Sequence, residues 1–122
     1  LIGRRAPLHV TADGQLMPGL GGETATEGYA KRTNLPAYTR NTLSSIEKLK
    51  PVCIKAAEQG YSFDDEEAEI GVGGIGVLIH DRAGNVGAGL SVSAPIERRK
   101  PAWIEDLRAA GRLISEQLGY QG

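Results

Sequence analysis

The stretch YSFDDEEAEIGVGGIGVLIHD, residues 61–81, places four consecutive acidic residues shortly before four glycines that fall within six positions. The acids are Asp64, Asp65, Glu66 and Glu67, and the glycines are Gly71, Gly73, Gly74 and Gly76. So many glycines can form a phosphate cradle, a hinge or the floor of a pocket. The residues around them decide between these uses.

The glycines open a predicted β-hairpin. The segments GVGGIGVLIHD (71–81) and NVGAGLSVSAP (85–95) both have the composition of strands, and DRAG (81–84) supplies a turn between them. A loop over 81–84 places His80 opposite Asn85. The register then pairs 78 with 87, 76 with 89 and 74 with 91.

Side-chain alternation gives this hairpin two different faces. One face is branched and apolar, and it consists of Ile75, Val77, Ile79, Val86, Ala88, Leu90 and Val92. The other is nearly bare, and it consists of Gly74, Gly76, Gly87, Gly89, Ser91 and Ser93. A bare face serves either close backbone packing or a small ligand that meets the two hydroxyls. A loop one residue longer or shorter would exchange the faces.

Two helices are predicted around the hairpin. The first spans roughly 45–59, with Ser44 and Glu47 in a capping-box pattern, Gly60 as the stop and an expected kink at Pro51. The second follows Pro101 and carries an apolar stripe expected to pack on the apolar face of the hairpin. Its members are Trp103, Leu107, Ala110, Ile114 and Leu118. The first third of the chain is predicted to be rich in loops, and any helix near Asp13 should end before Pro18.

Composition excludes several classes of protein. The chain has 122 residues, enough for one domain, and a formal net charge of −1, which gives no field for binding nucleic acid directly. Its only cysteine, Cys53, is predicted to fill the core, and no apolar run is long enough to span a membrane. We therefore expect a cytoplasmic domain. Because LIGRRAPLH reads as sequence from within a domain, we also expect a piece of a longer chain.

Other motifs carry little chemistry. Gly71, Gly73 and Gly76 match the dinucleotide fingerprint G-x-G-x-x-G, but acids precede them and a β-branched run follows, where nucleotide binding needs a strand and then a helix. The acidic run lacks the spacing of a calcium loop, so no metal or other cofactor is predicted. His9 and His80 are isolated and are interpreted as structural. If the chain is extended near Phe63, residues 64 and 66 face one way and 65 and 67 the other.

Four segments together resemble the effector-binding domain of the isocitrate-lyase-regulator (IclR) family of bacterial transcription regulators. They are PLHVTADGQLM, LPAYTRNTL, the long stretch from Gln59 to Pro95, and LISEQLGY. The resemblance implies an α/β (α+β) fold that is GAF-like or profilin-like, with an antiparallel sheet flanked by helices on both sides. It implies that residues 1–122 form a ligand-sensing domain incomplete at its N-terminus, with the helix-turn-helix DNA-binding domain outside this chain.

The resemblance also implies a site for a small effector, an organic acid or an aromatic or neutral metabolite. Its contacts carried over by motif are the amides near Ala12 and Asp13, the side chain of Asp64, position 74, and the hydroxyls of Ser91 and Ser93. Asp64 is expected to be the one acid of the four with a role in the site, with its neighbours in a turn or at the surface.

Three departures from the family pattern bear on the effector. Gly74 stands where many members have a cysteine, Asp13 where small residues are usual, and Gln15 where a basic residue is common. These changes favour a bulkier or neutral effector over a small carboxylate. The expected partners are the effector, further copies of the chain in a dimer or tetramer, and DNA only through the other domain.

Two alternatives belong to other classes. One is a small enzyme in which Asp64 acts as a general base for Ser91 and Ser93. The other is a pure oligomerisation module with an empty or collapsed pocket. Under the sensor hypothesis, effector binding reorders residues 12–28 and changes how two domains associate.

Overall fold

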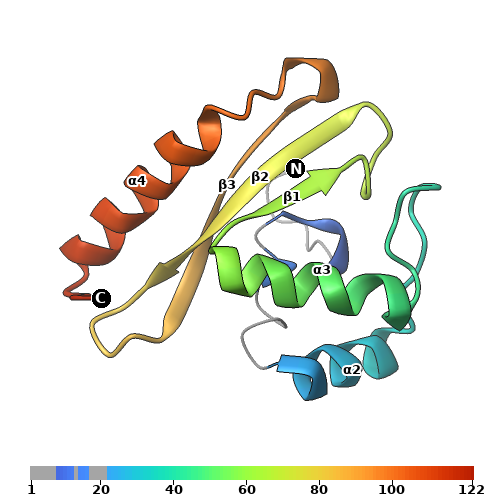
Figure 1. Cartoon of the computed structure of the whole chain (residues 1–122), viewed down its shortest axis with the longest axis horizontal. Coiled ribbons are helices and arrows are strands. Elements are labelled where there is room, and N and C mark those ends of the chain that lie inside the picture. The colour runs from blue at the N-terminus through green and yellow to red at the C-terminus, as the bar shows by residue number, and fades with distance from the viewer. Residues whose placement is uncertain (1–7, 13, 17–21) are drawn as a thin grey trace.

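A three-stranded antiparallel sheet separates two layers of helices in the computed structural model, which describes residues 8–12, 14–16 and 22–122 (Figure 1). The strands are β1 (Ser62–Asp65), β2 (Val72–His80) and β3 (Val86–Pro95), in that spatial order. Helix α4 (Trp103–Gln117) lies on one side, and α2 (Gly22–Thr33) and α3 (Ile46–Gln59) lie on the other (Figure 1). Short 3₁₀ helices occur at η1 (Leu8–Val10) and η2 (Ile96–Arg98). This α+β architecture confirms the predicted fold class.

The hairpin of β2 and β3 keeps its predicted faces but not its predicted register. Gly74 pairs with Ser93, Gly76 with Ser91 and Leu78 with Gly89, so each glycine meets a residue two positions further along than expected. The ladder closes at His80 and Val86, which makes the loop one residue longer, and a bulge beside Ile79 adds a second residue. A total shift of two residues keeps each side chain on its predicted face of the sheet, so the apolar and bare faces remain as predicted. The bulge removes only Val86 from the apolar set.

The apolar face of the sheet and α4 form one core. Ile75, Val77 and Leu107 are buried there, and Trp103 packs against them in a partly buried position. The predicted stripe on α4 is wrong in part, because Leu118 is 53% exposed and the buried positions are Leu107, Gly111 and Ser115. The helix turns its small residues to β2, where a Cβ at Gly111 would lie 3.0 Å from Val77 Cγ2. Small residues thus allow close approach of helix and strand.

The other core lies between α2 and α3. Its buried members are Tyr29, Leu35, Leu49 and Cys53, so Cys53 fills the core as predicted, and burial raises the pKa of its thiol to about 11. Helix α3 begins after Ser45 and ends at Gly60, whose φ of 83° supplies the predicted left-handed stop. It runs through Pro51 as one continuous element.

Helix α2 corrects the expectation of a loop-rich first third. Its sequence GETATEGYAKRT contains few large apolar residues and an internal glycine, Gly28, so its periodicity is weak. The helix is stabilised by packing: Tyr29 is buried against α3, and the Glu27 carboxylate pairs with Lys50 Nζ at 2.7 Å. Among the described residues, no helix is both long and apolar enough to cross a membrane.

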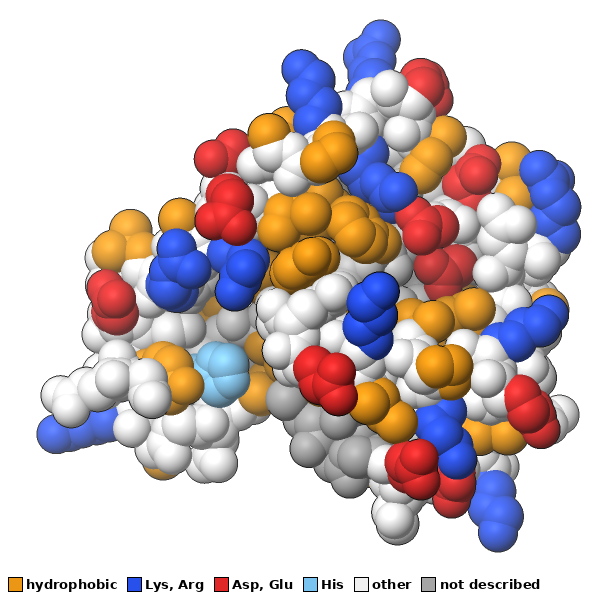
Figure 2. Space-filling view, in the orientation of Figure 1, with side chains coloured by type: hydrophobic (Ala, Val, Ile, Leu, Met, Phe, Trp, Pro, Cys, Tyr) orange, Lys and Arg blue, Asp and Glu red, His pale blue; other side chains and the backbone are white. Residues whose placement is uncertain are grey.

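The surface carries both signs of charge. Figure 2 shows acidic and basic side chains interspersed around a central hydrophobic patch on the face seen in Figure 1. No single-sign field covers this face, in agreement with the formal net charge of −1.

The close packing of α4 on β2 makes a prediction. Gly111→Leu should lower the free energy of unfolding by roughly 1–3 kcal/mol, because its side chain must displace Val77 or lift the helix off the sheet. Urea denaturation measures this loss. Ala109→Leu, on the exposed side of α4, is the matched control and should leave the midpoint nearly unchanged. Equal midpoints for the two variants would contradict the packing described here.

Candidate functional site

The bare face of the sheet carries two rows of residues that run across all three strands, and we name this strip the glycine trough. One row is Asp64–Gly74–Ser93 and the other is Ser62–Gly76–Ser91. Gly74 and Gly76 of β2 therefore each lie between a polar side chain of β1 and a serine of β3. A Cβ added at Gly74 would lie 3.6 Å from both Asp64 Cβ and Ser93 Oγ.

The two walls of the trough differ in exposure. Ser62 and Asp64 on β1 are buried, at 2% and 8% exposed, and Gly74 and Gly76 on β2 are buried as well. Ser91 and Ser93 lie on β3 and are exposed. The hydroxyls of β3 are thus available to a ligand, whereas the β1 wall already has protein partners.

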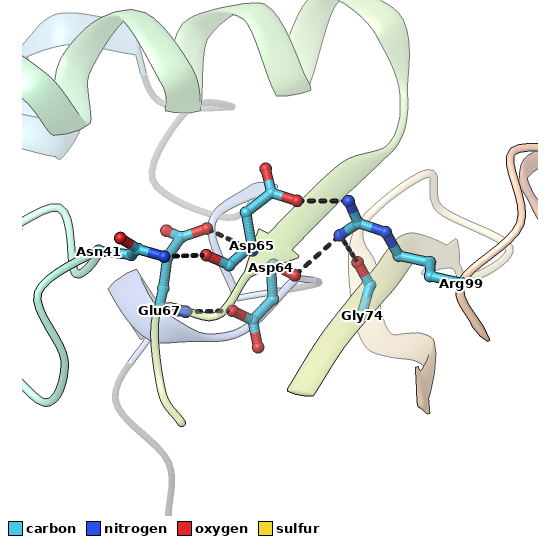
Figure 3. Close-up of polar contacts among 6 residues, drawn as sticks. All are labelled: Asn41, Asp64, Asp65, Glu67, Gly74 and Arg99. Atoms are coloured by element: carbon cyan, nitrogen blue, oxygen red, sulfur yellow. Dashed lines mark hydrogen bonds and ion pairs between the residues drawn. The ribbon is translucent and has the colours of Figure 1, made fainter. Parts of the chain in front are cut away.

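A tight turn follows β1 and brings two acids inward (Figure 3). Glu66 has a φ of 60°, so the chain leaves the extended conformation there and the strict alternation expected for residues 64–67 fails. The Glu67 amide donates to Asp64 Oδ1 at 2.8 Å, and Glu67 Oε2 accepts from the Asp65 amide at 2.8 Å. Asp64 faces inward as predicted, but Glu67 is also buried, at 5% exposed. The expectation that Glu67 belongs to the surface is wrong.

The segment LPAYTRNTL holds this turn from outside. Thr42 Oγ1 donates to the Glu67 carbonyl at 2.5 Å, and Thr39 Oγ1 donates to the Glu66 carbonyl at 2.6 Å. Asn41 Nδ2 donates to the Asp65 carbonyl at 3.3 Å (Figure 3). These bonds satisfy carbonyls that the left-handed turn removes from the sheet.

Arg99 fixes the same region from the opposite face of the sheet. Its Nη1 donates to the Asp64 carbonyl at 2.9 Å, and its Nη2 pairs with the Asp65 carboxylate at 2.5 Å (Figure 3). Its guanidinium lies 4.8 Å from the centre of the Phe63 ring, on the side that carries α4. The sequence offered no local signal for this arginine, which lies 35 residues from Asp64. Its charge lowers the pKa of the Asp64 carboxyl against the larger effect of burial.

Gln15 covers the β1 wall of the trough. Its side chain is fully buried, donates from Nε2 to Glu67 Oε1 at 2.6 Å and accepts from Ser62 Oγ at 3.1 Å. Neither Gln15 nor Glu67 was predicted as a partner of the other, because 52 residues separate them. Sequence periodicity does not report contacts between residues so far apart, so nothing in the sequence indicated that Gln15 and Glu67 are buried together.

Burial dominates the electrostatics of the two inward acids. It raises the pKa of Glu67 to about 7, and the nearby Asp64 and Asp65 charges add to that rise against the hydrogen bonds from Asp65 N and Gln15. Burial likewise raises the pKa of the Asp64 carboxyl. The trough therefore has an acidic wall that resists ionisation.

The other residues named from the sequence lie in the N-terminal segment or at the end of β2. Ala12 is buried, in the turn that the Gln15 amide closes by donating to the Thr11 carbonyl at 3.1 Å, and Asp13 lies outside the described residues. His9 is buried and bonds the Tyr29 hydroxyl at 3.0 Å, and the His80 ring stacks on Tyr120, so both have structural contacts. In the part of the chain that the structure describes, no cluster of three metal-ligating side chains occurs.

A cavity of about 600 Å³ lies between α3 and β1. Lys55, Tyr61, Ser62 and Glu67 are among the residues that line it. Two members of the Gln15 network therefore border space that could admit water or a ligand.

The antiparallel sheet, the helices on both sides and the glycine trough define a small α+β domain of the GAF-like type. Comparison with known proteins identifies its family. The family model described as bacterial transcriptional regulator IclR C-terminal matches residues 1–116, and the chain belongs to this family.

Individual relatives agree with this assignment. The HTH-type transcriptional regulator KdgR of Escherichia coli K12 is 38% identical over 98% of this chain and 47% of its own length. The crystal structure of the KdgR C-terminal domain superposes with a TM-score of 0.85 at 37% identity, covering 98% of this chain and 75% of that one. An IclR homologue from Microbacterium hydrocarbonoxydans, solved in complex with 4-hydroxybenzoate, gives a TM-score of 0.86 at 26% identity, covering 97% of this chain and 48% of that one.

Two consequences follow from these relatives. They are named as transcriptional regulators and repressors, and none of these names describes an enzyme. The chain spans about half the length of the curated relatives it matches.

The raised pKa of Glu67 predicts how stability depends on pH. Between about pH 4.5 and pH 7 the folded protein holds a proton on Glu67 that the unfolded chain has released, so stability falls as pH rises through this window. The total loss from this group is at most about 3 kcal/mol. Urea denaturation at pH 5 to pH 8 measures the slope.

Glu67→Gln removes the titrating group and should flatten this slope. Glu69→Gln replaces an exposed acid two residues away and should leave it in place. A slope that is the same in Glu67→Gln as in the parent would show that another group controls it.

Proposed function

We propose that this chain is the ligand-sensing domain of a bacterial transcriptional regulator and that its effector binds in the glycine trough. The observation that carries the proposal is the pair of rows across the sheet, in which Gly74 and Gly76 clear space between polar side chains on β1 and β3. A few polar groups that converge around a position without side chains are typical of a small-molecule site.

The polar groups of the trough favour a particular kind of effector. Ser91 and Ser93 supply hydroxyls that donate or accept, while burial raises the pKa of the Asp64 carboxyl and of the nearby Glu67. Arg99, which could balance an anion, contacts the other face. We infer a neutral or hydroxyl-bearing effector, bulkier than a small carboxylate. The 4-hydroxybenzoate complex of the homologue supports a small organic ligand with a hydroxyl group.

The regulatory output is proposed to come from association of domains. The relatives named HTH-type contain roughly twice the length of this chain, which leaves room for a DNA-binding domain outside it. In the proposed cycle, effector binding reorders residues 12–28, alters how two copies of the domain pack in a dimer or tetramer, and so changes DNA affinity. This places the protein in the cytoplasm, where its operator lies.

A thermal-shift screen tests the site. A panel of neutral hydroxylated metabolites, aromatic acids and short-chain organic acids should contain at least one compound that raises the melting temperature in proportion to its concentration. The double variant Ser91→Ala, Ser93→Ala should lose most of that rise. Ser44→Ala, an exposed serine outside the sheet, is the control and should retain it. A rise that is equal in all three proteins would move the site away from β3.

Filling the trough should block the effector without unfolding the domain. Gly74→Val adds a β-branched side chain that suits a strand. Its Cβ would lie 3.3 Å from the Val92 carbonyl oxygen, a contact that requires a small shift, and 3.6 Å from Asp64 Cβ and Ser93 Oγ. We expect the melting temperature of the ligand-free protein to change by only a few degrees and the ligand-induced rise to disappear. Retention of the full rise in Gly74→Val would exclude the trough as the binding site.

A further inference from the structure

The buried side chain of Gln15 forms hydrogen bonds to three separate parts of the chain. It is 0% exposed, and its single amide group joins three places: the Glu67 carboxylate, the Ser62 hydroxyl and, at 2.9 Å, the carbonyl of His9 in its own segment. The first two partners belong to β1 and its following turn. The amide is therefore a cross-link between the N-terminal segment and the sheet.

The partners of Gln15 lead to both rows of the trough. Ser62 is the β1 member of the row that contains Gly76 and Ser91. Glu67 reaches the other row, because its backbone amide donates to Asp64 Oδ1. A shift of Gln15 would therefore disturb the β1 members of both rows, Ser62 and Asp64.

Gln15 also helps to fix the backbone near Ala12, which is the candidate ligand-binding segment. Its own amide donates to the Thr11 carbonyl at 3.1 Å and closes the turn that contains Ala12. Gly14 is tightly enclosed in this turn, since a Cβ there would lie 2.7 Å from the Leu8 carbonyl oxygen. The turn is consequently compact, and its side-chain tie to β1 is Gln15.

We propose that Gln15 is a positioning residue that holds the turn around Ala12 over the glycine trough by cross-linking it to Ser62 and Glu67. The role of this turn in binding rests on the proposed function, whereas the cross-link can be tested without any ligand.

The chemistry of glutamine suits this position. Its amide supplies two donor hydrogens, which go to Glu67 and His9, and an acceptor oxygen, which receives the Ser62 hydroxyl. Lysine or arginine could donate to Glu67 but offers no acceptor to Ser62. An apolar side chain at position 15 would leave the Glu67 carboxylate and the Ser62 hydroxyl buried without these hydrogen bonds.

The charges around Glu67 determine what the bond from Gln15 does. Asp64 and Asp65 of β1 face the carboxylate, Cys53 of α3 is close enough to feel its charge, and Lys55 of α3 lines the same cavity. Donation from Gln15 favours the ionised form of Glu67 and lowers its pKa against the effect of burial. Loss of Gln15 should therefore raise that pKa further.

Amide hydrogen exchange without ligand tests the cross-link. In Gln15→Met, which keeps side-chain length and removes the hydrogen bonds, exchange at Val10, Thr11 and Ala12 should be faster by about tenfold or more, as expected for loss of a bond to a charged group. Exchange in α4 should not change. The matched control is Gln59→Met, which loses a 2.9 Å bond from Nε2 to the Tyr61 carbonyl and should leave residues 10–12 unaffected.

A second variant covers the case in which Gln15→Met does not fold. Ser62→Ala removes only the hydroxyl that donates to Gln15 Oε1 and should speed exchange at the same amides by roughly threefold. Unchanged protection of residues 10–12 in whichever variants fold would overturn the proposal.

The pH midpoint of Glu67 separates positioning from general support of the fold. A carbon-detected NMR titration of its side-chain carboxyl should show a midpoint near 7 in the parent and a higher midpoint in Gln15→Met. A variant that is merely less stable would keep the parent midpoint. That outcome would show that Gln15 does not act through Glu67.

Binding of 4-hydroxybenzoate, used as a defined probe, connects the cross-link to function. If the parent binds the probe, Gln15→Met should weaken binding by about tenfold, since a bond of this kind to a charged group contributes that much, and Gln59→Met should not. Equal affinity in parent and Gln15→Met would overturn the positioning role. Absence of binding to the parent would exclude this aromatic hydroxy acid as a ligand, and the exchange measurements would still decide the cross-link.

Discussion

The alternation of side chains along β2 is the constraint on which the rest of this structure depends. Odd-numbered residues from Ile75 to Ile79 give the sheet a branched face, and α4 buries it through Leu107 and the small residue Gly111. The even-numbered Gly74 and Gly76 give the other face a floor without side chains. One strand therefore builds a core on one side and a trough on the other, and both would be lost if the register moved by a single residue.

The acidic turn after β1 completes the trough at a cost in electrostatic free energy. Glu67 and Asp64 are buried, so each gives up hydration, and the structure offsets part of that cost with hydrogen bonds from backbone amides and from Gln15. Arg99 braces the same turn from the α4 side. Polar groups held this firmly cost little to organise when a ligand arrives, which is a useful property for a sensor.

Short-range patterns in the sequence predicted most of the scaffold. The stop signal of α3, the composition of the hairpin strands and the inward direction of Asp64 were correct, whereas the capping box of Ser44 was wrong, because Ser45 is the N-cap and makes no side-chain capping bond. The register was wrong by two residues because the loop is one residue longer than predicted and a bulge beside Ile79 adds a second, neither of which leaves a local signal. Helix α2 was missed because packing of Tyr29 stabilises a weakly amphipathic helix. Gln15, Glu67 and Arg99 were missed for another reason: their roles depend on contacts between residues 35 or more positions apart.

The most direct test of the central claim is an NMR map of effector binding. The protein is labelled with ¹⁵N and titrated with the compound that gives the largest thermal stabilisation. The account predicts that the largest amide shifts occur at Gly74, Gly76, Ser91 and Ser93, with smaller shifts at Ala12. Shifts concentrated instead in the separate cavity lined by His80, Arg112 and Tyr120 would contradict it and place the effector on the α4 side of the sheet.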